Sequence, residues 1–378
     1  MSIELIAVAL AGSLVAYFNG ANDVSKGIAT LVGSGLTNYR RAILWGTVCT
    51  GLGGLSGAAL ANAMVQTFGK GLLANGTIPT FAAALATILG ASAWVAIATR
   101  TGMPVSTTHA IVGSLAGVAI LAYGLHGIKW SALLGKIALP LLLSPILALG
   151  LTLVAIRVVR FVQRRFSTDA DCACATVELS PVPAAIAMDG TASAELSFPS
   201  LGVKVARKEE CVAGKRILLG ISAHHLHWFT SGATSFARGM NDAPKMVAIV
   251  LAAAMLHGSY QIHSGAFALV TLGMVAGSWL AGRRVATVLA ERITPMDHWE
   301  GFLANAVTAA LVTPGAALGL PMSTTHVASG SIMGIGLQNR TATNWRTVRE
   351  MLLAWVVTLP VAAMLGSLIY LSLRAVHV

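Results

Sequence analysis

Two polar motifs each occur twice in an otherwise apolar sequence. The pattern G-x-N-D-x-x-K fills Gly20–Lys26 and returns, 219 residues later, at Gly239–Lys245. The pattern P-x-S-T-T-H fills Pro104–His109 and returns, 217 residues later, at Pro321–His326. Because the two spacings differ by so little, the sequence indicates one structural unit that is repeated along the chain.

The Ser-Thr-Thr triplets have the chemistry of an anion site. A G-x-P segment precedes each triplet, and proline favours the first turn of a helix. We therefore expect both triplets at helix N-termini, where backbone N–H groups, the helix dipole and the hydroxyls attract an oxyanion. One triplet alone is most simply a capped helix start, but two copies favour a site between repeats. His109 and His326, which end the motifs, either satisfy a neighbouring carbonyl group or form a proton relay. The predicted anion-binding hydroxyls are those of Ser106, Thr107, Thr108, Ser323, Thr324 and Thr325.

Asp23 and Asp242 are carboxylates in apolar surroundings. An ionised side chain in the centre of a membrane costs about 2.5–3.5 kcal/mol, so such a residue marks a functional site by default. Lys26 and Lys245 follow three residues later, on the same helical face, and balance the charge. The alternatives are a purely structural ion pair, or lysines that extend towards water.

The composition indicates a membrane protein. Of the 378 residues, 56% are hydrophobic and 10% are charged. A soluble domain carries about 25% charged residues and a disordered chain is poor in apolar ones, so both classes are excluded. The sequence predicts an all-α polytopic membrane protein with two inverted repeats, each of about five to six helical segments, some discontinuous or re-entrant. Several stretches without Asp, Glu, Lys or Arg are long enough for a membrane helix of about 20 residues. These are Ala42–Gly69, Gly71–Thr99, Ile137–Ile156 and Met351–Leu373.

A hydrophilic segment divides the repeats. We expect the first membrane repeat over residues 1–162, a linker over 163–215 and the second membrane repeat over 216–378. Basic residues flank the linker, so the positive-inside rule places it in the cytoplasm. Extended structure is expected over Ala194–Val205, and the linker cysteines match no standard zinc pattern, so no firm metal site is predicted. The net charge of +11 mostly reflects such anchoring and does not indicate nucleic acid as a partner. The paired arginines expected to anchor span ends are Arg40, Arg41, Arg283 and Arg284.

These motifs resemble the signature of the inorganic phosphate transporter (PiT) family, a duplicated G-A-N-D-V-A-N-like motif with a duplicated P-V-S-T-T-H-like motif. The likeness covers both repeats and all four motifs in order. It implies a secondary transporter rather than an enzyme. Such a protein imports inorganic phosphate across the plasma membrane (the inner membrane in bacteria) by alternating access, without a cofactor. It also implies H⁺ or Na⁺ as the coupling ion and a homodimer in the lipid bilayer. The implied phosphate ligands are the six hydroxyls above with Asn22, Asp23, Asn241 and Asp242, and the last four are also the implied Na⁺ ligands.

The sequence departs from that signature where the family usually has asparagine. Lys26 and Lys245 stand at the end of the first motif in both halves. Because an ammonium is a compact positive charge, we hypothesise that the lysines, paired with Asp23 and Asp242, replace at least part of the sodium requirement. Arg238 occupies the position that corresponds to Asn19 in the first half. It either adds charge for the anion or reaches the membrane interface.

A sulfate or other tetrahedral oxyanion permease of the same family is the alternative function. Phosphate keeps a P–OH donor at neutral pH, which a carboxylate accepts, whereas sulfate only accepts hydrogen bonds. Carboxylates beside the anion therefore favour phosphate. A membrane enzyme fits less well, because the Ser and His of each P-x-S-T-T-H motif lack an orienting third group. A passive channel would lack saturable uptake with counterflow.

Overall fold

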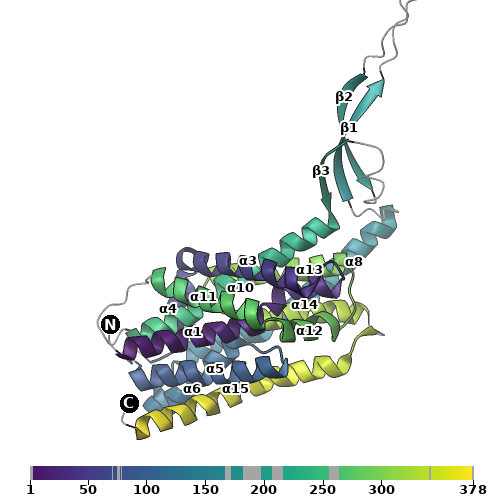
Figure 1. Ribbon diagram of the computed structural model, residues 1–378. Helices are drawn as coiled ribbons and strands as arrows, with labels where there is room; N and C mark the ends of the chain where they lie inside the picture. The colour runs from purple at the N-terminus through teal and green to yellow at the C-terminus, as the bar shows by residue number, and fades with distance from the viewer. Residues whose placement is uncertain are drawn as a thin grey trace, which may run out of the picture. The chain divides into compact units, whose positions relative to one another are not determined.

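The computed structural model describes residues 3–69, 71–74, 77, 79–166, 172–181, 197–206, 216–254, 264–339 and 342–376. The chain divides into two compact units. Met1–Ile156 and His227–Val378 together make the first unit, and Arg157–Leu226 make the second. Both sequence halves thus contribute to one unit (Figure 1).

The first unit is built from helices in its described part. The first half of the chain supplies α1 (Ile3–Asp23), α2 (Ser25–Gly33), α3 (Tyr39–Leu60), α4 (Asn62–Gly69), α5 (Phe81–Thr101), α6 (Thr107–Tyr123), α7 (Trp130–Ala132) and α8 (Leu139–Phe166). A 3₁₀ turn (Leu125–Gly127) precedes α7, and a π-helical stretch (Leu133–Ala138) joins α7 to α8. The second half supplies α10 (Ala223–Ala254), α11 (Ser264–Ala281), α12 (Arg283–Glu291), α13 (His298–Ala317), α14 (Thr324–Gln338) and α15 (Trp345–Ala375).

Several of these helices are suited to a bilayer. Within the described ranges, five are long and apolar enough to cross a membrane, namely Tyr39–Leu60, Phe81–Thr101, Trp130–Arg165, Ser264–Ala281 and Trp345–Ala375. Leu142, Ile146 and Val356, on α8 and α15, are each 66–72% exposed. Apolar side chains on an outer surface are expected where lipid is the solvent and every backbone group is satisfied within a helix.

Three of the four polar motifs lie where helices are interrupted, whereas Gly239–Lys245 lies within the continuous helix α10. α1 ends at Asp23 and α2 begins at Ser25, so the first motif spans a helix break. α5 ends before Gly102 (φ +77°) and α13 ends shortly before Gly319 (φ +70°), a left-handed backbone region that glycine enters without strain. α6 and α14 then start directly after Ser106 and Ser323. The prediction that both triplets lie at helix N-termini is confirmed.

Glycines hold the two sequence halves together at matching positions. A Cβ added at Gly20 of α1 would overlap the Met274 carbonyl of α11, and one added at Gly239 of α10 would overlap the Thr50 carbonyl of α3. Gly277 of α11 and Gly53 of α3 likewise approach the carbonyls of Tyr17 and Phe236. The contact between α1 and α11 is therefore repeated between α10 and α3, with the sequence halves exchanged.

The second unit contains a three-stranded antiparallel sheet in the order β2-β1-β3. Its strands are β1 (Cys172–Pro181), β2 (Ser197–Ala206) and β3 (Arg216–Ser222). Cys172 pairs with Ala206 on one side and with Ser222 on the other. The expected extended segment, Ala194–Val205, is found from Ser197 onwards, and its first three residues lie outside the described residues. Cys172 is a free thiol in this sheet.

The glycine contacts predict how the membrane unit responds to one added methyl group. Gly277→Ala should lower the melting temperature of the purified protein by several degrees, because overpacking against rigid backbone costs about 1–3 kcal/mol. Gly150→Ala is the matched control, since nothing lies within 4 Å of a Cβ at that helical position. Thermal unfolding in detergent checks this. Equal melting temperatures for the two variants would show that the α1–α11 contact is not tight.

Candidate functional site

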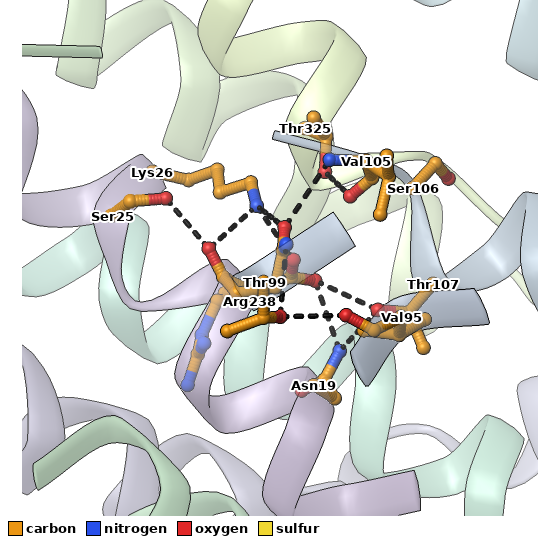
Figure 2. A network of polar contacts seen from close by, with 12 residues as sticks. Asn19, Ser25, Lys26, Val95, Thr99, Val105, Ser106, Thr107, Arg238 and Thr325 are labelled. Carbon is orange, nitrogen blue, oxygen red and sulfur yellow. Dashed lines mark hydrogen bonds and ion pairs between the residues drawn. The ribbon is translucent and has the colours of Figure 1, made fainter. Parts of the chain in front are cut away.

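All four motifs converge in the interior of the membrane unit. The first motif comes from the junction of α1 and α2, its copy from the middle of α10, and the hydroxyl triplets from the starts of α6 and α14. The ten predicted site residues and the two lysines are each at most 4% exposed. Figure 2 shows part of this network. The structure thus brings together, in one buried cluster, residues that are more than 200 positions apart in the sequence.

Lys26 is held at depth by three oxygen atoms. Its Nζ lies 2.6 Å from Asp23 Oδ1, and 2.8 Å from both the backbone oxygen and Oδ1 of Asn22. The side chain is fully buried, so it does not extend towards water. The Asp23–Lys26 pair that the spacing predicts is therefore formed.

Lys245 links the two halves. Its Nζ lies 3.1 Å from Asp242 Oδ1, 2.8 Å from Thr108 Oγ1 and 3.0 Å from the backbone oxygen of Met322. Asn241 Nδ2 donates to the same backbone oxygen at 2.9 Å and to Asp242 Oδ1 at 2.8 Å. One lysine thus contacts both P-x-S-T-T-H segments as well as its own carboxylate.

Asn19 bridges the two carboxylates, a role that the sequence analysis missed. Its Nδ2 lies 2.9 Å from Asp23 Oδ2, 3.2 Å from Asp242 Oδ2 and 3.1 Å from Thr107 Oγ1. Asn19 precedes Asp23 by four residues, about one helical turn, and this spacing is the feature of the sequence that indicates a contact between the two side chains. A single side-chain amide therefore sets the separation between the acidic groups of the two halves.

The extended segment before α6 is fastened to the other motifs by its backbone. Asn22 Oδ1 accepts from Val105 N at 3.2 Å, and Asn22 Nδ2 donates to the Met103 backbone oxygen at 3.0 Å and to Thr99 Oγ1 at 3.2 Å. Thr325 Oγ1, from the second half, donates to the Val105 backbone oxygen at 2.8 Å (Figure 2). Thr99 and Val105 belong to the site through contacts that no side-chain pattern reveals.

The hydroxyls of the two triplets divide into two groups. Ser106 and Ser323 cap their helices, each accepting from the backbone N–H of the histidine three residues later at 3.2 Å. Thr107 and Thr108 contact the charged groups, through Asp23 Oδ2 at 3.4 Å and Lys245 Nζ. The capping interpretation holds for the serines, whereas the threonines of α6 face the charges.

The two motif histidines meet across the halves. The ring centroids of His109 and His326 are 4.4 Å apart, and His326 stacks on Trp355 at 4.0 Å. His109 Nδ1 lies 2.8 Å from Ser106 Oγ. Both rings are at most 6% exposed. The pair is thus buried directly beside the starts of α6 and α14.

Arg238 changes the charge of the cluster. It is fully buried, so it does not reach the membrane interface, and it interacts electrostatically with Asp23 and Asp242. Its Nη2 lies 3.4 Å from Ser278 Oγ, while Nε and Nη1 have no hydrogen-bond acceptor in the described part of the chain. Together with Lys26 and Lys245 it gives three formal positive charges against two negative ones. Another buried carboxylate, that of Glu300, belongs to the capped start of α13 and not to this cluster.

The described residues contain no group of three His, Cys, Asp or Glu side chains that could hold a metal ion. Cys211, the third cysteine of the linker after Cys172 and Cys174, lies outside the described residues. What the cluster offers is a set of cations, hydroxyls and amides around two carboxylates. Such a set suits a small polar anion that also carries a hydrogen-bond donor.

Comparison with known proteins agrees with this chemistry. The profile described as "Phosphate transporter family" matches residues 19–366. The chain is 29% identical to the Bacillus subtilis protein named "probable low-affinity inorganic phosphate transporter", over 100% of this chain and 98% of that protein. It is 29% identical to the Arabidopsis thaliana protein named "inorganic phosphate transporter 2-1, chloroplastic", over 95% of this chain and 70% of that protein.

A solved structure has the same fold. It is titled "The sodium-dependent phosphate transporter", and the comparison gives a TM-score of 0.77 at 22% identity, covering 99% of this chain and 100% of that chain. The predicted multi-pass helical architecture is therefore confirmed. Since the family profile spans both copies of both motifs, the chain belongs to the phosphate transporter family, a family of membrane transporters and not of enzymes.

Proposed function

We propose that the chain is a secondary active transporter that imports inorganic phosphate across the plasma membrane by alternating access, with H⁺ or Na⁺ as coupling ion. The observation that carries this proposal is the buried cluster in which both copies of both motifs meet and cations outnumber carboxylates. A phosphate ion bound there compensates the surplus positive charge. The names of the relatives support phosphate as the substrate.

The carboxylates favour phosphate over sulfate. Asp23 Oδ1 accepts from Lys26, and Asp242 Oδ2 accepts from Asn19, so each of these oxygens keeps one lone pair for a further donor. The P–OH group of phosphate supplies such a donor, whereas sulfate presents only acceptors to these oxygens. The proposed ligands are Asn22, Asp23, Ser106, Thr107, Thr108, Asn241, Asp242, Ser323, Thr324 and Thr325.

The lysines take the place of coupling cations in this proposal. The three oxygens around Lys26 Nζ, from a carboxylate, an amide and a backbone carbonyl, are the ligand types that a hard cation prefers. Lys245 has a comparable set of three oxygens. Because an ammonium already fills each set, the sodium requirement is reduced or lost. The His109–His326 pair is the candidate proton relay, since the two rings lie in contact and each imidazole nitrogen can donate or accept a proton.

Alternating access requires two repeats that can exchange roles. The mirrored glycine contacts, α1 with α11 and α10 with α3, support two related repeats over 1–162 and 216–378. α5 packs against α6 and α13 against α14, with a P-x-S-T-T-H motif at each turn, which supports a matching helical hairpin in each half. We propose that these hairpins are re-entrant and that the repeats are inverted. We further propose a cytoplasmic location for the linker over 163–215 and a homodimer as the assembly.

Competition for uptake tests the substrate. In proteoliposomes, arsenate should inhibit uptake of radiolabelled phosphate strongly, because it has the same shape and a hydroxyl donor, and tenfold excess sulfate should inhibit it by less than about a fifth. Asp242→Asn should abolish most transport and weaken the discrimination. Glu350→Gln, which neutralises an exposed carboxylate on α15, is the matched control. Uptake of sulfate in preference to phosphate would refute the assignment.

Sodium dependence tests the role of the lysines. Wild-type uptake should change by less than about twofold when Na⁺ is replaced by K⁺ or choline. Lys26→Asn should lower Na⁺-free uptake by about tenfold or more, because an unpaired buried charge costs about 3–5 kcal/mol, and added Na⁺ should restore part of the activity. Strict Na⁺ dependence of the wild type that persists in Lys26→Asn would contradict the proposal.

A pH gradient tests the histidine pair. An inward proton gradient should accelerate wild-type uptake, and His109→Gln should remove that acceleration while uptake without a gradient falls less, since glutamine keeps a polar group but has no titratable one. His126→Gln, an exposed histidine outside the site, should behave as the wild type. Unchanged acceleration in His109→Gln would exclude the relay.

A further inference from the structure

An open cleft with a volume of about 730 Å³ lies beside the buried cluster. Its walls come from α1, the end of α5, the end of α11, and α12 with the residue that follows it. Every charged side chain in the lining is an arginine. These are Arg100, Arg283, Arg284 and Arg292.

The cleft adjoins the candidate phosphate site. Thr99 lines the cleft and also accepts a hydrogen bond from Asn22 Nδ2 at 3.2 Å. Phe18, another lining residue, directly precedes Asn19, which bridges the two carboxylates. One wall of the cleft is therefore also the wall of the buried cluster.

Two of the arginines are positioned by the protein. Arg284 Nη1 donates to the Arg100 backbone oxygen at 2.6 Å, at the last turn of α5. Arg283 lies 5.4 Å from the centre of the Tyr39 ring, whose hydroxyl donates to Glu291 at 2.5 Å. Glu291 is thus an acidic neighbour of this group, and its carboxylate is engaged by the tyrosine. A second carboxylate, that of Glu350, lines a neighbouring pocket with Arg292 and pairs with Arg346. From the sequence, Arg283 and Arg284 are expected only as ordinary span-end anchors, because no local pattern indicates a common cleft.

The other two arginines are available to a ligand. Arg100 and Arg292 are exposed, and across the described ranges neither guanidinium has a hydrogen-bond acceptor or an ion-pair partner. Guanidinium groups match the geometry of phosphate oxygens in a bidentate manner and are readily stripped of water. Four cations around a concave surface with low-dielectric walls also raise the local concentration of anions.

From these observations we infer that the cleft is an outer binding site for a phosphate-type oxyanion, separate from the buried cluster. This inference rests on the proposed function, because the role of the cleft is to collect the anion next to the transport site, with which the cleft shares a wall. The same chemistry is carried by free phosphate and by the phosphate group of an anionic lipid, whose charge no choline balances. Both sources present an oxyanion to the same arginines.

The test removes the two available arginines. In vesicles of neutral phosphatidylcholine, Arg100→Gln/Arg292→Gln should raise the KM for phosphate by about three- to tenfold, with a smaller change in kcat, and should flatten the dependence of KM on ionic strength. Arg40→Gln/Arg41→Gln is the matched control. It removes two exposed arginines at the start of α3, outside the cleft, and should keep the wild-type KM.

Lipid composition separates the two sources. If free anion occupies the cleft, the KM shift appears in neutral vesicles and also in vesicles that contain phosphatidylglycerol. If the phosphate of an anionic lipid occupies it, the KM values of the cleft variant and the wild type differ only in vesicles that contain phosphatidylglycerol. The wild type and the control then retain that lipid through purification, and the cleft variant does not. Identical KM values and salt dependence for the cleft variant and the wild type in both vesicle types would overturn the inference, as would an equal shift in the control.

Binding measurements keep this inference distinct from the transport proposal. Equilibrium binding of radiolabelled phosphate and of phosphatidylglycerol to the purified protein does not depend on turnover. A lower stoichiometry of bound phosphate, or loss of phosphatidylglycerol, in Arg100→Gln/Arg292→Gln but not in the control supports the cleft even if the wild type transports no phosphate. If the cleft variant binds phosphate and phosphatidylglycerol as the wild type does, and the wild type transports phosphate, the inference about the cleft is wrong and the transport proposal is unaffected.

Discussion

Buried charge is the constraint on which the rest of this structure depends. Two carboxylates and three cations lie inside a helical membrane unit, each at most 4% exposed. Removing an ion from water costs several kcal/mol unless partners replace the water, so each ammonium must lie on its carboxylate. Asn19 then holds the two carboxylates on one amide, and separating the halves would leave both pairs incompletely satisfied.

The interruptions of the helices follow from that constraint. A continuous α5–α6 helix would satisfy its own backbone and leave nothing for Asn22, whereas the extended segment at Met103–Val105 offers a carbonyl and an N–H to this side chain. Glycines let α1 approach α11 and α10 approach α3, so each helix that carries a G-x-N-D-x-x-K motif is packed against a helix of the other half. The backbone thus supplies hydrogen-bonding groups at a depth where water does not.

Local features of the site could be predicted from the sequence, but the contacts that join its distant segments could not. The i,i+3 spacing of Asp242 and Lys245 fixes their pairing, and the serine of each triplet caps the helix start, because both are properties of a single helix turn. The bridging role of Asn19 and the backbone contact at Val105 depend on packing between segments about 80 to 220 residues apart.

Arg238 illustrates the limit of sequence reasoning most directly. The sequence left two environments open for it, and only the packing of α10 among the other helices buries it beside Asp23 and Asp242. The same holds for the arginine cleft, which exists because the end of α5 meets α12. In the second unit the sequence predicts one short extended segment, and the structure has a sheet of three strands, since strand pairing joins residues that no local pattern connects.

The central claim is that the surplus positive charge of the buried cluster binds the anion without sodium. Calorimetric titration of phosphate into the purified protein in Na⁺-free buffer tests it most directly. The comparison is Arg238→Asn, which introduces the residue type that the first half has at the corresponding position, Asn19. The account predicts binding by the wild type and a Kd weaker by about tenfold or more in Arg238→Asn, at a retained melting temperature. Equal affinities in the two proteins, or binding by the wild type only when Na⁺ is present, would contradict it.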